Sequence, residues 1–273
     1  MKGLKNLGNT CYFNSIVQCI IQIPQISNVF LIKKIETSCE FTKEFQKFIK
    51  QYWFKKDENV ISPLKLYQLF KQNHKQFDNE NENDAQEGFL CILDDLEKSL
   101  KEFNLIPTLF FGEIEQKTVY PNGVSVVKEP IALNMINVFK DCSITDALNE
   151  YTKWNVVDGY VDSDKNSYNF ANVKRLFSKL PKLLVLSFSM YNRKNKITLE
   201  ETLDMGNYVV NSEQRCLYDL VATCIHCGTV NNGHYVSFTK HHDKWYFKDD
   251  DNCTHVNTFP TTDNHYIVFY LKR

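Results

Sequence analysis

The fold is decided by one stretch near the start of the chain, Gly3-Leu4-Lys5-Asn6-Leu7-Gly8-Asn9-Thr10-Cys11-Tyr12-Phe13-Asn14-Ser15-Ile16-Val17-Gln18-Cys19-Ile20-Ile21. After Cys11 the apolar residues recur with the spacing of one helix face, and Pro24 would end that helix. Cys11 therefore lies at a helix N-terminus, where Asn9 or Thr10 can cap the first turn. Because unpaired N–H groups and the helix dipole favour negative charge there, the pattern predicts a stabilised, nucleophilic thiolate.

A second motif, far along the chain, supplies a histidine. The run 231–238 contains Gly233 and His234 and alternates like a strand, and the run 244–251 is aromatic and then acidic, which predicts two strands joined by a polar turn at 241–243. On adjacent antiparallel strands His234 and Asp249 can be neighbours. A cysteine, then a histidine, then an acidic residue is the chain order of papain-like cysteine proteases.

Both motifs resemble the signature boxes of the ubiquitin-specific proteases, a family of papain-like deubiquitinases. The first matches the cysteine box Gly-Leu-x-Asn-Leu-Gly-Asn-Thr-Cys-Tyr-x-Asn-Ser at every fixed position. The second matches the histidine box at Tyr218, His226, Gly228, Gly233, His234 and Tyr235, and the chain closes with the strand pattern 265–270. The resemblance favours a nucleophile at Cys11 over the common alternative, a buried structural cysteine.

The resemblance covers nearly the whole chain and implies an α+β, papain-like fold. We expect one catalytic domain over residues 1–273, with a helical thumb over 1–108, reduced β fingers and a connecting segment over 109–170, and a β palm over 171–273. Helices are expected over about 40–55, after Ser62-Pro63, from the acidic loop 78–84 through Phe103, and over 143–151 with Ser143 as cap. The segment 168–188 resembles the palm strand that leads to a substrate loop.

The fingers of many relatives bind a structural zinc through two Cys-x-x-Cys pairs. Here Cys142 is the only cysteine between Cys91 and Cys216, so we expect zinc-free fingers with a hairpin turn at 121–123 and neither metal nor other cofactor. Cys224-Ile225-His226-Cys227 imitates a metal-binding pair, but no second pair lies at a suitable spacing, and we interpret it as a buried strand.

The resemblance also implies roles at the catalytic centre. His234 would act as general base, Asp249 would orient it, and Asp250 is a second candidate as helper. The acidic run 249–251 could otherwise be a solvated turn. Asn6, with the backbone N–H of Cys11, would donate hydrogen bonds to the oxyanion, and loss of one such donor typically raises the barrier by about 3 kcal/mol. Asn14 and Ser15 are expected to support the helix face.

Substrate contacts are implied at the start of the third expected helix. Asp84 and Glu87 would bind the arginine-containing tail of ubiquitin, for which carboxylates are suitable acceptors, although an acidic N-cap and first turn explain them equally well. Here Asn83 and Gly88 depart from the usual glutamine and phenylalanine. Gly233 and Tyr235 would form a narrow channel that admits a Gly-Gly tail.

Two further stretches depart from the family or vary within it. Ser189-Met190-Tyr191 stands where an arginine-phenylalanine pair is usual, which affects loop contacts near the ubiquitin tail. Residues 192–215 are polar and are expected to form a variable loop region.

Composition limits the partners. The chain has 273 residues, of which 43% are hydrophobic, with 32 basic and 33 acidic side chains, so it can bury a large core and offers no reason to expect nucleic acid or an anionic membrane. We expect a monomer in the cytoplasm or nucleus, with most of its nine cysteines as buried thiols. Only Met1 and Lys2 precede the cysteine box, so no upstream domain is expected.

The resulting hypothesis is a deubiquitinating thiol hydrolase that cleaves the (iso)peptide bond after the C-terminal glycine of ubiquitin. Its partners would be ubiquitin and ubiquitin-conjugated proteins. Three alternatives remain: a protease for another ubiquitin-like modifier, a catalytically silent ubiquitin-binding protein, and, more distantly, a zinc-binding interaction protein.

Overall fold

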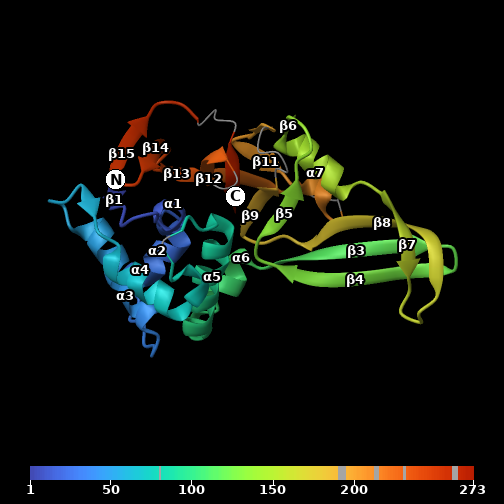
Figure 1. The fold of residues 1–273 in the computed structure, drawn as a ribbon, viewed down its shortest axis with the longest axis horizontal. Helices are drawn as coiled ribbons and strands as arrows, with labels where there is room; N and C mark the ends of the chain where they lie inside the picture. The colour runs from blue at the N-terminus through green and yellow to red at the C-terminus, as the bar shows by residue number, and fades with distance from the viewer. Residues whose placement is uncertain (80, 190–194, 212–214, 230–231, 260–263) are drawn as a thin grey trace.

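The structure is a computed structural model that describes residues 1–79, 81–189, 195–211, 215–229, 232–259 and 264–273. Figure 1 shows a group of helices, a sheet beside it and a long β extension that points away from both. Of the substrate-loop positions named above, Met190 and Tyr191 lie outside the described residues, as does Asn231 of the histidine motif.

Helices form the thumb. They are α1 Cys11–Ile21, α2 Pro24–Ile32, α3 Glu40–Phe54, α4 Leu64–Asn73, α5 Ala85–Ser99 and α6 Leu105–Phe110, with short 3-10 helices at Lys75–Phe77 and Lys101–Phe103. The helices predicted near 40–55 and after Ser62-Pro63 are confirmed. The α-helix predicted through Phe103 ends earlier, at Ser99; the chain continues as the 3-10 helix Lys101–Phe103, which the left-handed φ of 45° at Asn104 terminates.

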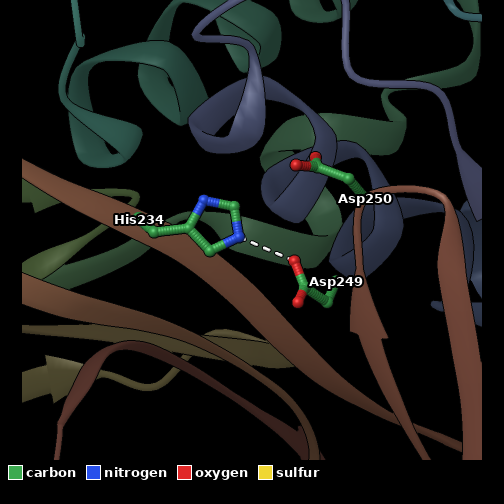
Figure 2. A group of neighbouring side chains, drawn as sticks. All are labelled: His234, Asp249 and Asp250. Carbon is green, nitrogen blue, oxygen red and sulfur yellow. Dashed lines mark hydrogen bonds and ion pairs between the residues drawn. The ribbon is translucent and has the colours of Figure 1, made fainter.

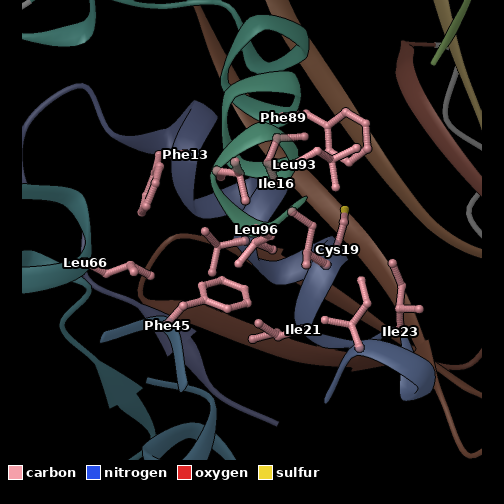
Figure 3. Close-up of a cluster of buried hydrophobic side chains, with 14 of the residues drawn as sticks. Phe13, Ile16, Cys19, Ile21, Ile23, Phe45, Leu66, Phe89, Leu93 and Leu96 are labelled. Carbon is pink, nitrogen blue, oxygen red and sulfur yellow. The ribbon is translucent and has the colours of Figure 1, made fainter. Parts of the chain in front are cut away.

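The helix α1 is the centre of the first core. All of its residues are buried, and it packs against α5 on one side and the strand β13 on the other. Figure 3 shows Phe13, Ile16 and Cys19 of this helix among side chains from α3, α4 and α5. The apolar face of α1 lies in this core, and its buried polar residues Asn14 and Gln18 have hydrogen-bond partners, so burial of α1 fixes the position of its first residue, Cys11.

The palm is built on one large sheet. Its strands run in the order β15-β14-β13-β12-β16-β9-β5, with β11 paired to β12. Their bounds are β5 Asn134–Asn137, β9 Leu183–Ser189, β11 Thr202–Asp204, β12 Leu217–Thr229, β13 Asn232–His241, β14 Lys244–Asp249, β15 Asn252–Val256 and β16 His265–Lys272. One face packs on the thumb, and the other forms a second core with α7 Ile144–Thr152, which has the predicted Ser143 cap.

The fingers form a second sheet, in the order β4-β3-β8-β7. The strands are β3 Gly112–Tyr120, β4 Gly123–Ile131, β7 Asn155–Val161 and β8 Ser167–Lys179, and the predicted hairpin turn joins the first two. The segment 168–188 is two strands, not one: β8 belongs to the fingers and crosses the expected boundary at 170, whereas β9 belongs to the palm. Pro181 separates them, since proline cannot donate to a ladder.

Smaller elements complete the chain. The parallel pairs are β1 Gly3–Leu4 with β2 Val60–Ile61, and β6 Cys142–Ser143 with β10 Ile197–Thr198. Within the region predicted as a loop, 192–215, the described parts also hold β11 and a 3-10 helix at Gly206–Tyr208.

The cysteines are less buried than the sequence led us to expect. All nine are free thiols, but only Cys11, Cys19 and Cys224 are buried, so the prediction of mostly buried thiols is wrong. Strand ends and helix surfaces expose the others in part. No single helix in the described chain has the length and apolarity to cross a membrane; α1 and α2, bent by 81°, meet that test only as a pair.

A charged side chain is buried where the palm meets the thumb. Lys248, the residue before Asp249, is 2% exposed. Its Nζ donates to Gln18 Oε1 of α1 at 2.6 Å and to the Tyr52 hydroxyl of α3 at 3.0 Å. Burial lowers the pKa of Lys248 to about 7, although the nearby Cys19 and Cys253 act in the opposite direction.

This burial predicts a pH dependence of stability. The unfolded chain, with a lysine pKa of about 10.4, binds one more proton than the folded protein between pH 7 and 10, so the free energy of unfolding rises with pH by about 1.4 kcal/mol per unit there. Lys248→Met should remove this rise and leave Gln18 paired with Tyr52. The free energy of unfolding, measured with denaturant at pH 7 and pH 9, tests this prediction. An equal rise with pH in the wild type and in Lys248→Met would show that Lys248 does not cause it.

Candidate active site

The loop before α1 fixes the start of that helix. Gly8 and Asn9 adopt left-handed φ values of 95° and 49°, which turn the chain sharply into Cys11. Thr10 occupies the N-cap position but makes no side-chain cap bond; its hydroxyl accepts from the Leu7 N–H at 3.0 Å and donates to Asn6 Oδ1 at 3.2 Å. Thr10 therefore does not cap α1 as expected, because loop contacts occupy its hydroxyl.

The thiol of Cys11 is almost completely enclosed, with the residue 5% exposed. Burial raises the pKa of Cys11, and the charges of Asp250 and Glu82 add to this effect, while hydrogen bonds from the backbone of Tyr235 and Tyr12 oppose it. The net direction is upward, so the expected stabilised thiolate is wrong for the free protein. Desolvation outweighs the helix N-terminus here.

The base and its partner lie at one end of the β13–β14 hairpin. The two strands pair from Ser237 with Lys248 to His241 with Lys244, which carries His234 and Asp249 to the same end. His234 Nε2 and Asp249 Oδ1 are 2.6 Å apart, as Figure 2 shows. This contact uses Nε2 and leaves Nδ1 for proton exchange with a thiol. Among the described residues, no hydrogen bond joins His234 to Cys11.

Asp250 has different partners, two asparagines from the N-terminal segment. Its φ of 45° turns the chain directly after Asp249. One carboxylate oxygen accepts from Asn14 Nδ2 at 2.7 Å and the other from Asn6 Nδ2 at 2.6 Å. Burial raises the pKa of Asp250, while the Asn14 and Asn6 bonds lower it. The two candidate carboxylates thus do different things: Asp249 contacts the imidazole, and Asp250 joins two asparagines around α1.

The acidic run is therefore not a solvated turn. Asp251 also has a partner, since its Oδ1 accepts from the backbone N–H of Asn6 at 3.0 Å. The donor that would serve an oxyanion, Asn6 Nδ2, is directed at Asp250 in the free protein. His234, Asp249 and Asp250 have ligand atoms within 4.8 Å of one another and could by distance hold a cation, but the hydrogen bonds above already explain that proximity.

The predicted substrate carboxylates lie at the start of α5. Asp84 caps that helix, accepting from Gln86 N at 2.7 Å and Glu87 N at 3.2 Å, and its other oxygen accepts from the Tyr266 hydroxyl at 2.6 Å. This is the N-cap geometry of the structural alternative. Glu87 is exposed in the first turn. A pocket of about 130 Å³ opens beside it, with Gln86, His226 and Tyr266 in its wall.

Gly233 is required for a reason that the sequence did not reveal. A Cβ at this position would lie 2.1 Å from His226 Nε2, so the imidazole of the neighbouring strand occupies the space of a side chain. The ring of Tyr235 packs edge-on against the same imidazole, 4.5 Å between centroids, and is buried. The backbone of Tyr235 donates a hydrogen bond to the Cys11 thiol.

Three residues with functional contacts were not identified from the sequence: Glu82, which contacts the backbone beside His234; Asn14, expected only as a helix support; and Tyr266, which holds Asp84. Each acts through a partner more than 150 positions away in the chain. Asn14 is fixed in the cysteine box and Tyr266 belongs to the closing strand pattern 265–270, but no motif pointed to Glu82.

The comparisons with known proteins come from sequence and structure. Ubiquitin carboxyl-terminal hydrolase Usp2 of Drosophila melanogaster is 25% identical, covering 99% of this chain and 34% of its own. Human ubiquitin carboxyl-terminal hydrolase 2 is 23% identical over a match that covers 99% of this chain and 55% of the human protein. The chain thus spans a third to about half of these relatives.

Among solved structures, the SAGA DUB module with Ubp8 bound to monoubiquitin has a TM-score of 0.87 at 21% identity, covering 100% of this chain and 69% of that one. The Ubp8 module bound to ubiquitin aldehyde has a TM-score of 0.83 at 21% identity, covering 100% of this chain and 70% of that one. These likenesses confirm the predicted α+β fold of a ubiquitin-specific protease. The family model described as ubiquitin carboxyl-terminal hydrolase matches residues 2–270, and the chain therefore belongs to this family.

Proposed function

We propose that the protein is a cysteine-type deubiquitinase that hydrolyses the bond after the C-terminal glycine of ubiquitin. The observation that carries the proposal is the 2.6 Å contact between His234 and Asp249, on the hairpin whose Tyr235 amide reaches the Cys11 thiol. The family supports it, as do relatives named ubiquitin carboxyl-terminal hydrolases and structural neighbours bound to ubiquitin.

The chemistry follows from these positions. His234 Nδ1 takes the proton of the Cys11 thiol as the sulfur attacks the carbonyl carbon of the terminal glycine. Burial raises the pKa of Cys11 in the free protein, which favours proton transfer together with the attack over a stable ion pair formed beforehand. Asp249 keeps the imidazole oriented and stabilises the imidazolium that forms.

The later steps use the same residues. The backbone N–H of Cys11 at the start of α1 and the second N–H of Asn6 Nδ2, whose first N–H is held by Asp250, donate to the oxyanion. The imidazolium of His234 then protonates the leaving lysine amine, which releases the first product and leaves a thioester on Cys11. Water activated by His234 hydrolyses the thioester and frees the terminal carboxylate.

Hydrolysis of ubiquitin bearing a C-terminal amide-linked fluorophore tests this proposal, with Cys11→Ala as control. We expect release by the wild type and none by the variant. Release only from another ubiquitin-like modifier with the same fluorophore would support the alternative substrate. The missing hydrogen bond between Cys11 and His234 favours a second candidate, a silent ubiquitin receptor, which binding of ubiquitin without any release would support.

A further inference from the structure

A carboxylate reaches across the protein to the backbone beside the catalytic histidine. Glu82 lies in the loop before α5, and Gly233 lies in β13, one residue before His234. Glu82 Oε2 accepts a hydrogen bond from the Gly233 N–H at 2.6 Å. The bond joins thumb and palm over 151 positions of sequence, and no family motif described above includes Glu82.

The Gly233 N–H faces the side on which Cys11 lies. In a strand, the N–H groups of residues i and i+2 point to the same edge. The Tyr235 N–H points to the Cys11 thiol, so the Gly233 N–H points to that side as well, about 7 Å further along the strand. The pairing of β13 with β14 stops at Ser237, so β14 does not cover this edge.

An extended peptide tail that brings its last carbonyl to Cys11 must run beside this edge. Main-chain hydrogen bonds to an uncovered strand edge are the ordinary way in which extended peptides bind. The Gly233 N–H is a donor for such a tail, and in the free protein Glu82 already occupies it. The carboxylate and a substrate carbonyl cannot both accept this bond in good geometry.

We propose that Glu82 is an internal competitor for the substrate tail: its carboxylate binds the Gly233 N–H in the free protein and must be displaced before Cys11 can attack. The proposal rests on the proposed function, because it assigns a role at that same site. Displacement also moves a negative charge away from the thiol. When the tail binds, the Glu82 carboxylate leaves the Gly233 N–H. The same displacement makes loss of the Cys11 proton easier.

The electrostatic part follows from the groups around the thiol. These are Glu82 from the loop before α5, Asp250 after β14, Tyr12 in α1 and Cys224 in β12. Burial is the main reason why the pKa of Cys11 is raised, and Glu82 contributes in the same direction. Removing this carboxylate should therefore make the thiol more acidic.

Two substitutions separate the two effects. Glu82→Gln removes the charge but keeps an oxygen that can accept from Gly233, whereas Glu82→Ala removes both. Asp78→Asn is the matched control, because it neutralises a carboxylate of the same loop that pairs with Lys71 at 3.1 Å and is not among the groups acting on Cys11.

The first measurement needs no ubiquitin. The rate of Cys11 alkylation by iodoacetamide is followed against pH, with the modified residue located by peptide mapping. We expect both Glu82 variants to react about threefold faster than wild type at pH 7, the order of the effect of one neighbouring unit charge at high dielectric constant. Asp78→Asn should match wild type. Equal rates in all four proteins would overturn the electrostatic role.

The second measurement is steady-state hydrolysis of the ubiquitin–fluorophore substrate. Loss of a competing hydrogen bond should lower KM in Glu82→Ala by about two- to tenfold, with kcat unchanged, and Glu82→Gln should lie closer to wild type. An unchanged or raised KM in Glu82→Ala, with an active wild type, overturns the role of Glu82 alone. A folded wild type that hydrolyses no ubiquitin overturns the proposed function itself.

Discussion

Replacement of Asp249 by alanine should lower kcat for ubiquitin hydrolysis by about 10⁴-fold, the size of the loss when the orienting carboxylate of a catalytic triad is replaced. Asp249 Oδ1 is the atom that holds His234 Nε2, at 2.6 Å. Without it the imidazole loses its fixed orientation, and Nδ1 no longer faces the thiol. Asp249→Asn should retain more activity, because an amide oxygen can still accept from the ring N–H.

The matched control for this prediction is Asp243→Asn. Asp243 lies in the turn of the same hairpin, and its left-handed φ of 59° is one that asparagine tolerates. Its exposed pair with Lys240 spans 3.7 Å and should contribute little. Activity of Asp249→Ala within threefold of wild type would mean that Asp249 is not the orienting residue.

Replacement of Asp250 by alanine should have a different signature. It frees Asn14 and Asn6, whose side-chain amides Asp250 now holds at 2.7 and 2.6 Å, so the oxyanion donor loses its position. We expect kcat to fall about 10²-fold, as for loss of one oxyanion donor, with little change in KM. The His234–Asp249 contact remains, so the imidazole should keep its orientation.

The alkylation rate of the Cys11 thiol should rise in Asp250→Ala, although kcat falls. Asp250 is one of the charges that raise the pKa of Cys11, so its removal lowers that pKa and shifts the alkylation profile to lower pH. Asp250→Ala should thus be alkylated faster at neutral pH and yet hydrolyse ubiquitin more slowly. If kcat and alkylation fall together, Asp250 supports the fold and not the position of Asn6.

Local patterns were sufficient for the elements whose causes are local. The helical spacing after Cys11 predicted α1, the alternation around His234 predicted the β13–β14 hairpin, and the Ser143 cap predicted α7. The residue types of the catalytic pair also followed from the sequence, because both lie on one hairpin of about twenty residues, and the register of adjacent strands limits their separation.

Features that depend on distant parts of the chain could not be predicted. One feature was missed although its cause is local: Thr10 had the right position for a cap, but contacts with Leu7 and Asn6, three and four residues before it, use its hydroxyl. The direction of the pKa shift at Cys11 depends on burial by elements from the whole chain, which no local pattern records. The different partners of the consecutive acidic residues depend on the left-handed φ at Asp250, which places its carboxylate beside Asn14 of α1.

The central claim is that Cys11 attacks the C-terminus of ubiquitin, and covalent capture tests it most directly. The wild type, Cys11→Ala and His234→Ala are each mixed with ubiquitin that carries a thiol-reactive group at its C-terminus, and intact mass and peptide mapping locate the bond. We expect one adduct at Cys11 in the wild type, none in Cys11→Ala and slower formation in His234→Ala. An adduct at another cysteine, or none in a folded wild type, would contradict the account.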